Sequence, residues 1–109
     1  MIYSQTLEVL HENNFGHIAK CKCCDEIQVG LGNTLLTFSE KEFQEFDYFF
    51  DEIRAYITSS NPDDRKFTIQ TKSKGVNLYL SYLELVNAVD LLDNAKIMMM
   101  VNGLLKNSL

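Results

Sequence analysis

The residues of this sequence best suited to chemistry are three cysteines and a histidine that lie within eight positions of one another. The segment from His17 to Cys24 contains Cys21, Cys23 and Cys24, which are all the cysteines of the chain, and one of its two histidines. Zinc in proteins favours thiolate and imidazole ligands in tetrahedral sets of four, and a C-x-x-C turn supplies two of them. The sequence therefore predicts a candidate zinc site formed by Cys21, Cys24, Cys23 and His17.

The fourth ligand of such a site is the difficulty, because no Cys or His follows Cys24. In an extended strand Cys21 and Cys23 would share one face and Cys24 would point to the other, which works against convergence. A site within one chain would therefore have to use His17, Cys23 or His11. Two chains that each contribute a C-x-x-C turn are the alternative.

Two other interpretations of the cysteines compete with metal binding. A catalytic C-x-x-C usually begins a helix, where the helix dipole lowers the thiol pKa. Here Cys24 is followed by Asp25 and Glu26 and then by strand-like sequence, and acidic neighbours raise a thiol pKa. The interpretation that the pattern favours is the plainest one, in which the cysteines are small buried apolar residues of a strand.

Two serine–glutamate pairs indicate where helices begin. Ser39 precedes Glu42 by three residues and Ser81 precedes Glu84 by three, and each pair forms a capping box. Apolar residues then recur at steps of three and four, which predicts helices to about residue 58 and about residue 106. The apolar face of the first helix includes Phe43, Phe46, Phe50, Ile53 and Ile57, widened by Phe49 and Tyr56.

Strand-like alternation precedes each of these helices, over residues 27–31 and 34–38 in the first case and 67–71 and 76–80 in the second. A shift of 42 positions superimposes the two sets, together with both capping boxes and two Ile-Gln pairs. We interpret this match as an internal strand–strand–helix duplication.

The predicted fold is α+β, a two-layer sandwich in which one antiparallel sheet of four to six strands packs against two helices on one face. Residues 1–109 form a single domain, with an N-terminal strand or hairpin region over 1–24 and the two repeated units over 25–60 and 66–107. Residues 1–16 also fit a short helix, so strand and helix both remain open there.

The composition limits the classes of partner. The net charge is −5 and the pI is about 4.9, which argues against a nucleic-acid partner because such binding relies on Lys and Arg. The longest apolar run covers residues 97–101, far short of the roughly 20 residues that span a bilayer. The first ten residues lack the pattern of a signal peptide. Three cysteines within four positions cannot form a disulfide framework. The expected location is the cytoplasm.

A run of three methionines marks the C-terminal helix. Consecutive residues of a helix are about 100° apart, so the run is apolar around much of the helix and needs cover on several sides. We expect a homodimer through this helix, with contacts from Met98, Met99, Met100 and Leu104.

One segment resembles a known family. The resembling residues are Cys21-x-x-Cys24, Ile27-Gln28-Val29, Gly32-Asn33, Leu36 and Glu42-Phe43. They are similar to a family of short bacterial proteins of Bacteroidetes type, a domain of unknown function with a C-x-x-C-x-x-I-Q…G-N signature. The resemblance is strong over about a quarter of the chain. It implies an architecture but no activity.

Three hypotheses for function follow. The first is a non-enzymatic binding or assembly module, because no complete catalytic set is present in the sequence. The second is a metal-binding or thiol-dependent protein that uses Cys21, Cys23 and Cys24, with zinc as the metal. The third is an enzyme that acts on a small ligand between sheet and helices.

Overall fold

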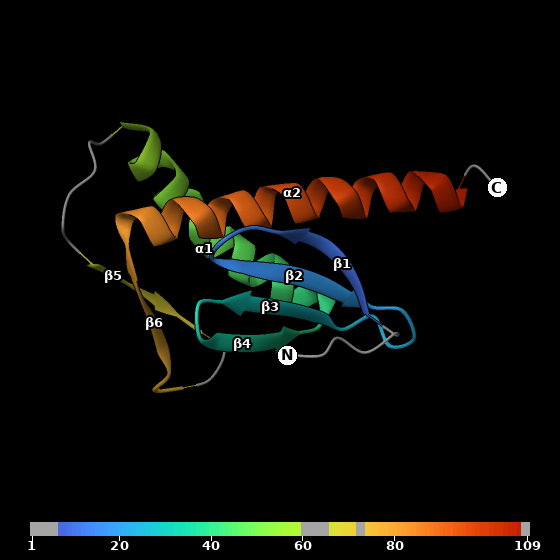
Figure 1. The fold of residues 1–109 in the computed structure, drawn as a ribbon, viewed down its shortest axis with the longest axis horizontal. Helices are drawn as coiled ribbons and strands as arrows, with labels where there is room; N and C mark the ends of the chain where they lie inside the picture. The colour runs from blue at the N-terminus through green and yellow to red at the C-terminus, as the bar shows by residue number, and fades with distance from the viewer. Residues whose placement is uncertain (1–6, 60–65, 72–73, 108–109) are drawn as a thin grey trace.

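Strands and helices follow one another in the order expected of two strand–strand–helix units after an N-terminal hairpin (Figure 1). The computed structural model describes residues 7–59, 66–71 and 74–107, and leaves out the side chains of 59 and 104–107. The elements are β1 (Leu7–Glu12), β2 (Gly16–Cys21), β3 (Ile27–Leu31), β4 (Thr34–Phe38), α1 (Glu40–Ser59), β5 (Lys66–Gln70), β6 (Asn77–Ser81) and α2 (Tyr82–Asn107).

The first four strands form an antiparallel sheet in the order β1-β2-β3-β4, so each strand pairs with its neighbour in the sequence. Ile18 pairs with Val29, and Val29 with Leu36. Since side chains alternate between the faces of a sheet, this register gathers apolar residues on one face. The other face carries His17, opposite Gly30.

The predicted α+β class is confirmed, but the strands divide between two sheets instead of one. β5 and β6 pair with each other and form a separate two-stranded sheet. The 20-residue helix α1 is about 30 Å long and carries the chain away from the edge of β4 before β5 begins. The second hairpin then contacts α2 through β6 (Figure 1).

The hydrophobic core lies between the four-stranded sheet and the two helices. α2 packs over β1 and β2, and α1 lies beside β4 and against α2 (Figure 1). Three phenylalanines connect the layers, because the ring of Phe46 lies 4.9 Å from that of Phe38 and 5.2 Å from that of Phe50. The helix residues with the most complete burial are Phe50, Leu85, Ala88, Leu91, Leu92 and Ala95.

Both predicted capping boxes are confirmed. The amide of Ser39 donates to the Glu42 carboxylate at 2.8 Å, and the amide of Glu42 donates to the Ser39 hydroxyl at 3.1 Å. The corresponding distances for Ser81 and Glu84 are 2.8 and 3.2 Å. These bonds satisfy amide groups that the first helical turn leaves free, and they fix the start of each helix.

The two units share their element order but differ in strand register. Ile27 pairs with Phe38 in the first hairpin. The shift of 42 positions places these residues on Ile69 and Leu80, yet Ile69 pairs with Leu78. A difference of two residues keeps the same side chains on the same face. The internal duplication therefore stays a prediction.

A charged network joins the two helices. The guanidinium of Arg54 on α1 contacts Asp47 Oδ1 at 2.6 Å and Asp93 Oδ1 on α2 at 2.9 Å. Lys96 on α2 contacts Asp47 Oδ2 at 3.0 Å. Lys96 is the last charged residue of α2 before Lys106, so residues 97–105 carry no charge. No helix in the described ranges is both long and apolar enough to cross a membrane.

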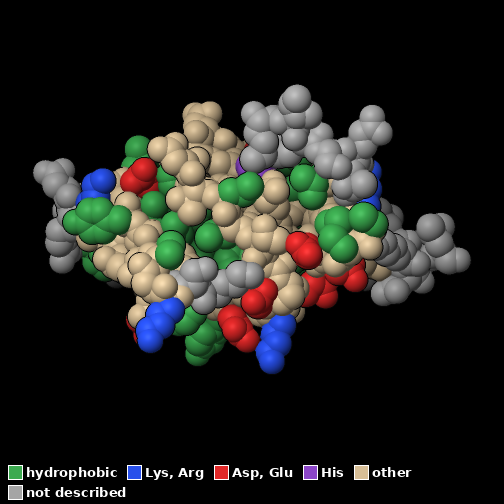
Figure 2. Space-filling model, turned by 90° about the horizontal axis from the view of Figure 1, so that it is seen from below, with side chains coloured by type: hydrophobic (Ala, Val, Ile, Leu, Met, Phe, Trp, Pro, Cys, Tyr) green, Lys and Arg blue, Asp and Glu red, His purple; other side chains and the backbone are tan. Residues whose placement is uncertain are grey.

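Exposed hydrophobic side chains occur at several separate places on the face of the molecule shown in Figure 2. Acidic side chains gather near the middle of this view, whereas Lys and Arg side chains stand singly. Phe49 is 55% exposed, although the helical spacing placed it at the border of the buried face of α1. The buried face of α1 is therefore narrower than the sequence indicated.

The N-terminal region is a hairpin over the described residues 7–21, as one of the two alternatives predicted. Asn13 closes its turn, because its side-chain oxygen accepts the amides of Phe15 at 2.9 Å and Gly16 at 3.1 Å. Its side-chain nitrogen donates to the Asn87 carbonyl and to Asp90 Oδ2 on α2, both at 3.0 Å. The hydrogen bond from Asn13 to Asp90 lowers the pKa of the Asp90 carboxyl group. Asn13 thus holds the hairpin against α2.

We expect Asn13→Ala to lower the free energy of unfolding by about 1–3 kcal/mol, because it leaves partly buried polar groups without partners. The neighbouring Asn14 is exposed, and Asn14→Ala should change stability by less than about 0.5 kcal/mol. Urea unfolding followed by circular dichroism measures both. Equal stability of the two variants would show that the side chain of Asn13 does not hold the hairpin.

Candidate metal centre

The cysteines lie at the junction of β2 with the connection to β3, in a segment that we call the thiol loop (residues 21–26). Cys21 is the last residue of β2, and its amide donates to the carbonyl of Glu26 at 2.8 Å. Asp25 has a φ of 57°, a left-handed conformation that Asp tolerates better than most residues. The closing hydrogen bond and this reversal turn the chain sharply between the two strands.

The turn brings the three sulfurs together. The Sγ atoms of Cys21, Cys23 and Cys24 all lie within 4.8 Å of one another, and Cys21 and Cys23 are 3.5 Å apart. Sulfurs that share one tetrahedral zinc ion at the usual Zn–S length are about 3.8 Å apart. The expected divergence of Cys24 does not occur, because the strand ends at Cys21 and the next two cysteines belong to the turn.

The thiols form a small hydrogen-bonded group centred on Cys21. Hydrogen bonds from the Cys24 thiol and from the backbone and thiol of Cys23 lower the pKa of Cys21. Donation to Cys21 raises the pKa of Cys23 and of Cys24. The charge of Glu26 raises the pKa of Cys24 as well, by a smaller effect than Cys21. Cys21 is therefore the first of the three to become a thiolate.

The solvent exposure of the three cysteines contradicts the interpretation that all of them are small buried residues. All three are free thiols, Cys21 is half-buried, and Cys23 and Cys24 are exposed. The interpretation as small buried residues of a strand is therefore wrong for Cys23 and Cys24. An exposed thiolate group remains available to a metal ion or to an oxidant.

The two histidines lie elsewhere. His17 is at the opposite end of β2 from Cys21, about 13 Å along the strand, and its Nε2 lies 2.9 Å from Gln28 Oε1. His11 Nε2 lies 3.1 Å from Asp90 Oδ2 on α2. Among the described residues, Cys21, Cys23 and Cys24 are the only group of three or more potential metal ligands that converges.

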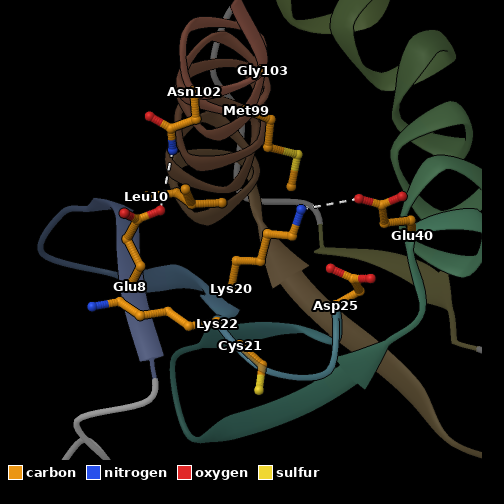
Figure 3. Close-up of a pocket in the computed structure, with 10 residues that line it drawn as sticks. All are labelled: Glu8, Leu10, Lys20, Cys21, Lys22, Asp25, Glu40, Met99, Asn102 and Gly103. Atoms are coloured by element: carbon orange, nitrogen blue, oxygen red, sulfur yellow. Dashed lines mark hydrogen bonds and ion pairs between the residues drawn. The ribbon is translucent and has the colours of Figure 1, made fainter. Parts of the chain in front are cut away.

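A groove of about 530 Å³ lies beside the thiol loop (Figure 3). Its walls come from the sheet end, the thiol loop, the first residue of α1 and the C-terminal half of α2, and Cys21 lies on one wall. Two polar contacts cross it, from Lys20 Nζ to Glu40 at 3.1 Å and from the Asn102 amide to Glu8 at 3.1 Å. This groove could not be predicted from sequence patterns, because the residues of its walls are far apart in the chain.

The order in which the thiols react is a testable consequence of this geometry. We expect the pH midpoint of alkylation to lie below the ordinary thiol value for Cys21 and above it for Cys23 and Cys24. Iodoacetamide labelling across a pH series, read by peptide mass spectrometry, measures each midpoint. Cys24→Ala removes the main cause of the low pKa and should raise the midpoint of Cys21. Identical midpoints for all three thiols would contradict the hydrogen-bonded group.

The fold and the thiol loop together define a class: an α+β protein that carries an exposed three-thiol group on a hairpin loop. The chain belongs to the family of unknown function DUF6686, whose model matches residues 2–107. The predicted resemblance to a family of unknown function is thereby confirmed, while the bacterial group and the signature stay predictions. Neither the curated proteins nor the solved structures provide a match to this chain.

Proposed function

We propose that this protein is a non-enzymatic module that binds a soft metal ion, zinc in the first instance, through the thiol loop. The observation that carries the proposal is the convergence of three Sγ atoms within 4.8 Å of one another. Thiolate ligands select zinc and copper(I) over magnesium and calcium. A loop that closes on itself by the Cys21–Glu26 hydrogen bond presents these ligands with little rearrangement.

Deprotonation of the thiols is the chemical step of binding. Cys21 has the lowered pKa and supplies the first thiolate. The charge of the bound metal then displaces protons from Cys23 and Cys24, so zinc binding releases protons and strengthens as the pH rises. Lys22 lies within the same loop and offsets part of the negative charge of three thiolates.

A nucleophilic cysteine would need a base and an orienting partner, and the positions of the histidines support a binding role instead. His17 lies beside Gln28 at the far end of β2, and His11 lies beside Asp90. Exposed free thiols persist in a reducing compartment, which supports a cytoplasmic location.

Zinc titration of the reduced, chelator-free protein tests the proposal. A chromophoric zinc chelator in competition reports the affinity, and a thiol reagent such as dithiobis(nitrobenzoate) reports protection. We expect one zinc per chain and slow reaction of all three thiols in the zinc-loaded protein. Three thiols that react equally fast with and without zinc would overturn the proposal.

A further inference from the structure

We propose that the end of the molecule bearing the thiol loop is the interface with a second copy of this chain, and that metal binding is coupled to this association. The inference rests on the proposed metal site and adds its partner. Four features of the described residues carry it: the ligand count, the helix surface, the shared groove and the loop charges.

The ligand count is the first feature. Three sulfurs fill three of the four positions that zinc takes in proteins. No carboxylate or imidazole joins the three thiols as a further ligand within the described part of the chain. A second copy brings three more thiols to the same place. If two zinc ions share one thiolate from each chain, each ion has four sulfur ligands and the pair uses all six cysteines.

The surface of α2 near the thiol loop is the second feature. Ile97, Met100 and Val101 are 55%, 68% and 41% exposed. Their spacing of three and four residues places them on one side of the helix. An exposed helix side normally carries charges, yet residues 97–105 have none. This stripe therefore has the character of a surface that packs against another helix.

Of the methionines expected to form a dimer contact, Met99 instead packs against the core of its own chain. Met98 is 39% exposed and borders the stripe. Leu104 continues the spacing of the stripe by one further step, but its side chain lies outside the described residues. The contact that we propose therefore depends on Ile97, Met100 and Val101.

The third feature is that one residue of the stripe, Met100, borders a cavity next to the groove that Cys21 lines. The 530 Å³ groove is lined by Cys21 and Lys22 from the thiol loop and by Met99 and Asn102 from α2 (Figure 3). A neighbouring cavity of about 400 Å³ shares Met99 with this groove and extends to Met100. A second chain that covers both the groove and this cavity therefore contacts Met100 as well as Cys21.

Charge complementarity is the fourth feature and favours a second copy over an unrelated partner. Lys22 and Asp25 have opposite charges in the same loop, and neither forms an ion pair within the described ranges. A two-fold contact is self-complementary, so it allows Lys22 of each copy to meet Asp25 of the other. The apolar stripes likewise match each other across such an axis.

Sedimentation velocity of the full reduced chain, with zinc ions or with a chelator, tests the coupling. We expect a 12.5 kDa monomer in chelator and a species of twice that mass with zinc, at one zinc per chain. Met100→Lys should raise the dimer dissociation constant about tenfold or more. Leu83→Lys is the matched control, because Leu83 is also 68% exposed on α2 but lies at the other end of the helix.

Each remaining outcome distinguishes the two proposals. A zinc-loaded monomer would overturn the interface and leave the metal site intact. A chain that binds no zinc would overturn the metal site and the coupling with it. A dimer that forms equally in chelator, or one that Met100→Lys and Leu83→Lys weaken equally, would contradict the metal-coupled interface.

Discussion

Replacing Cys21 with serine is expected to weaken zinc binding by about 100-fold or more, since even changes to groups that only orient a ligand cost 10- to 100-fold. Cys21 has the lowered pKa and accepts hydrogen bonds from both other cysteines. Its loss therefore removes one ligand and the centre on which the other two converge. Competition titration with a chromophoric chelator measures the change.

Lys22→Ala is the matched control for this variant. Lys22 lies between Cys21 and Cys23 in the same turn, is exposed and offers no thiol. We expect it to lower zinc affinity much less than Cys21→Ser does, through the loss of one nearby positive charge and of the proposed ion pair with Asp25 of the second copy. Equal losses of affinity in Cys21→Ser and Lys22→Ala would mean that loop charge governs binding and that the thiolate of Cys21 does not.

The second large effect concerns the core. Phe50→Ala should lower the free energy of unfolding by about 3–5 kcal/mol, because it removes a large buried ring and leaves a cavity. Phe50 is fully buried, and its ring packs 5.2 Å from that of Phe46. Such a loss is a large fraction of the 5–15 kcal/mol typical of a domain.

The adjacent Phe49 provides the comparison. It is the same residue type on the same helix, but it is 55% exposed. Phe49→Ala should change stability by less than about 1 kcal/mol. Urea unfolding measures the stability of the two variants. A larger loss of unfolding free energy for Phe49→Ala than for Phe50→Ala would contradict the orientation of α1 in the fold.

Local signals predicted most of the secondary structure. The two helix starts were predictable because a capping box forms within four residues of the chain. The strands were predictable because alternation reports a half-buried surface. The division into two sheets was not, because it depends on where α1 delivers the chain after 20 residues.

The candidate site was predictable in its residues but not in its geometry. The residue types and their spacing identified Cys21, Cys23 and Cys24. We had expected all three to lie in one continuing strand. Their convergence depends on the end of the strand at Cys21 and on the positive φ of Asp25. From the sequence, Asp25 was considered only as an acidic neighbour of Cys24, and its backbone conformation was not predicted. His17 is four residues from Cys21 in sequence, and an extended strand turns that short separation into a long distance.

The groove beside the thiols could not be predicted from the sequence. The hydrogen bond between Asn102 and Glu8 joins residues 94 positions apart. Neither residue belongs to a motif, and no periodic pattern in the sequence predicts that the two residues are in contact. Their contact follows from the packing of α2 across β1 and β2, which is a property of the whole fold.

X-ray absorption at the zinc edge of the zinc-loaded protein tests the metal site most directly. A zinc ion bound by the thiol loop should have a first shell made only of sulfur, at about 2.3 Å, with four scatterers when two copies share their thiolates. The same spectrum should lose sulfur in Cys21→Ser. A first shell of oxygen or nitrogen alone would contradict the thiol loop as the place where this protein binds metal.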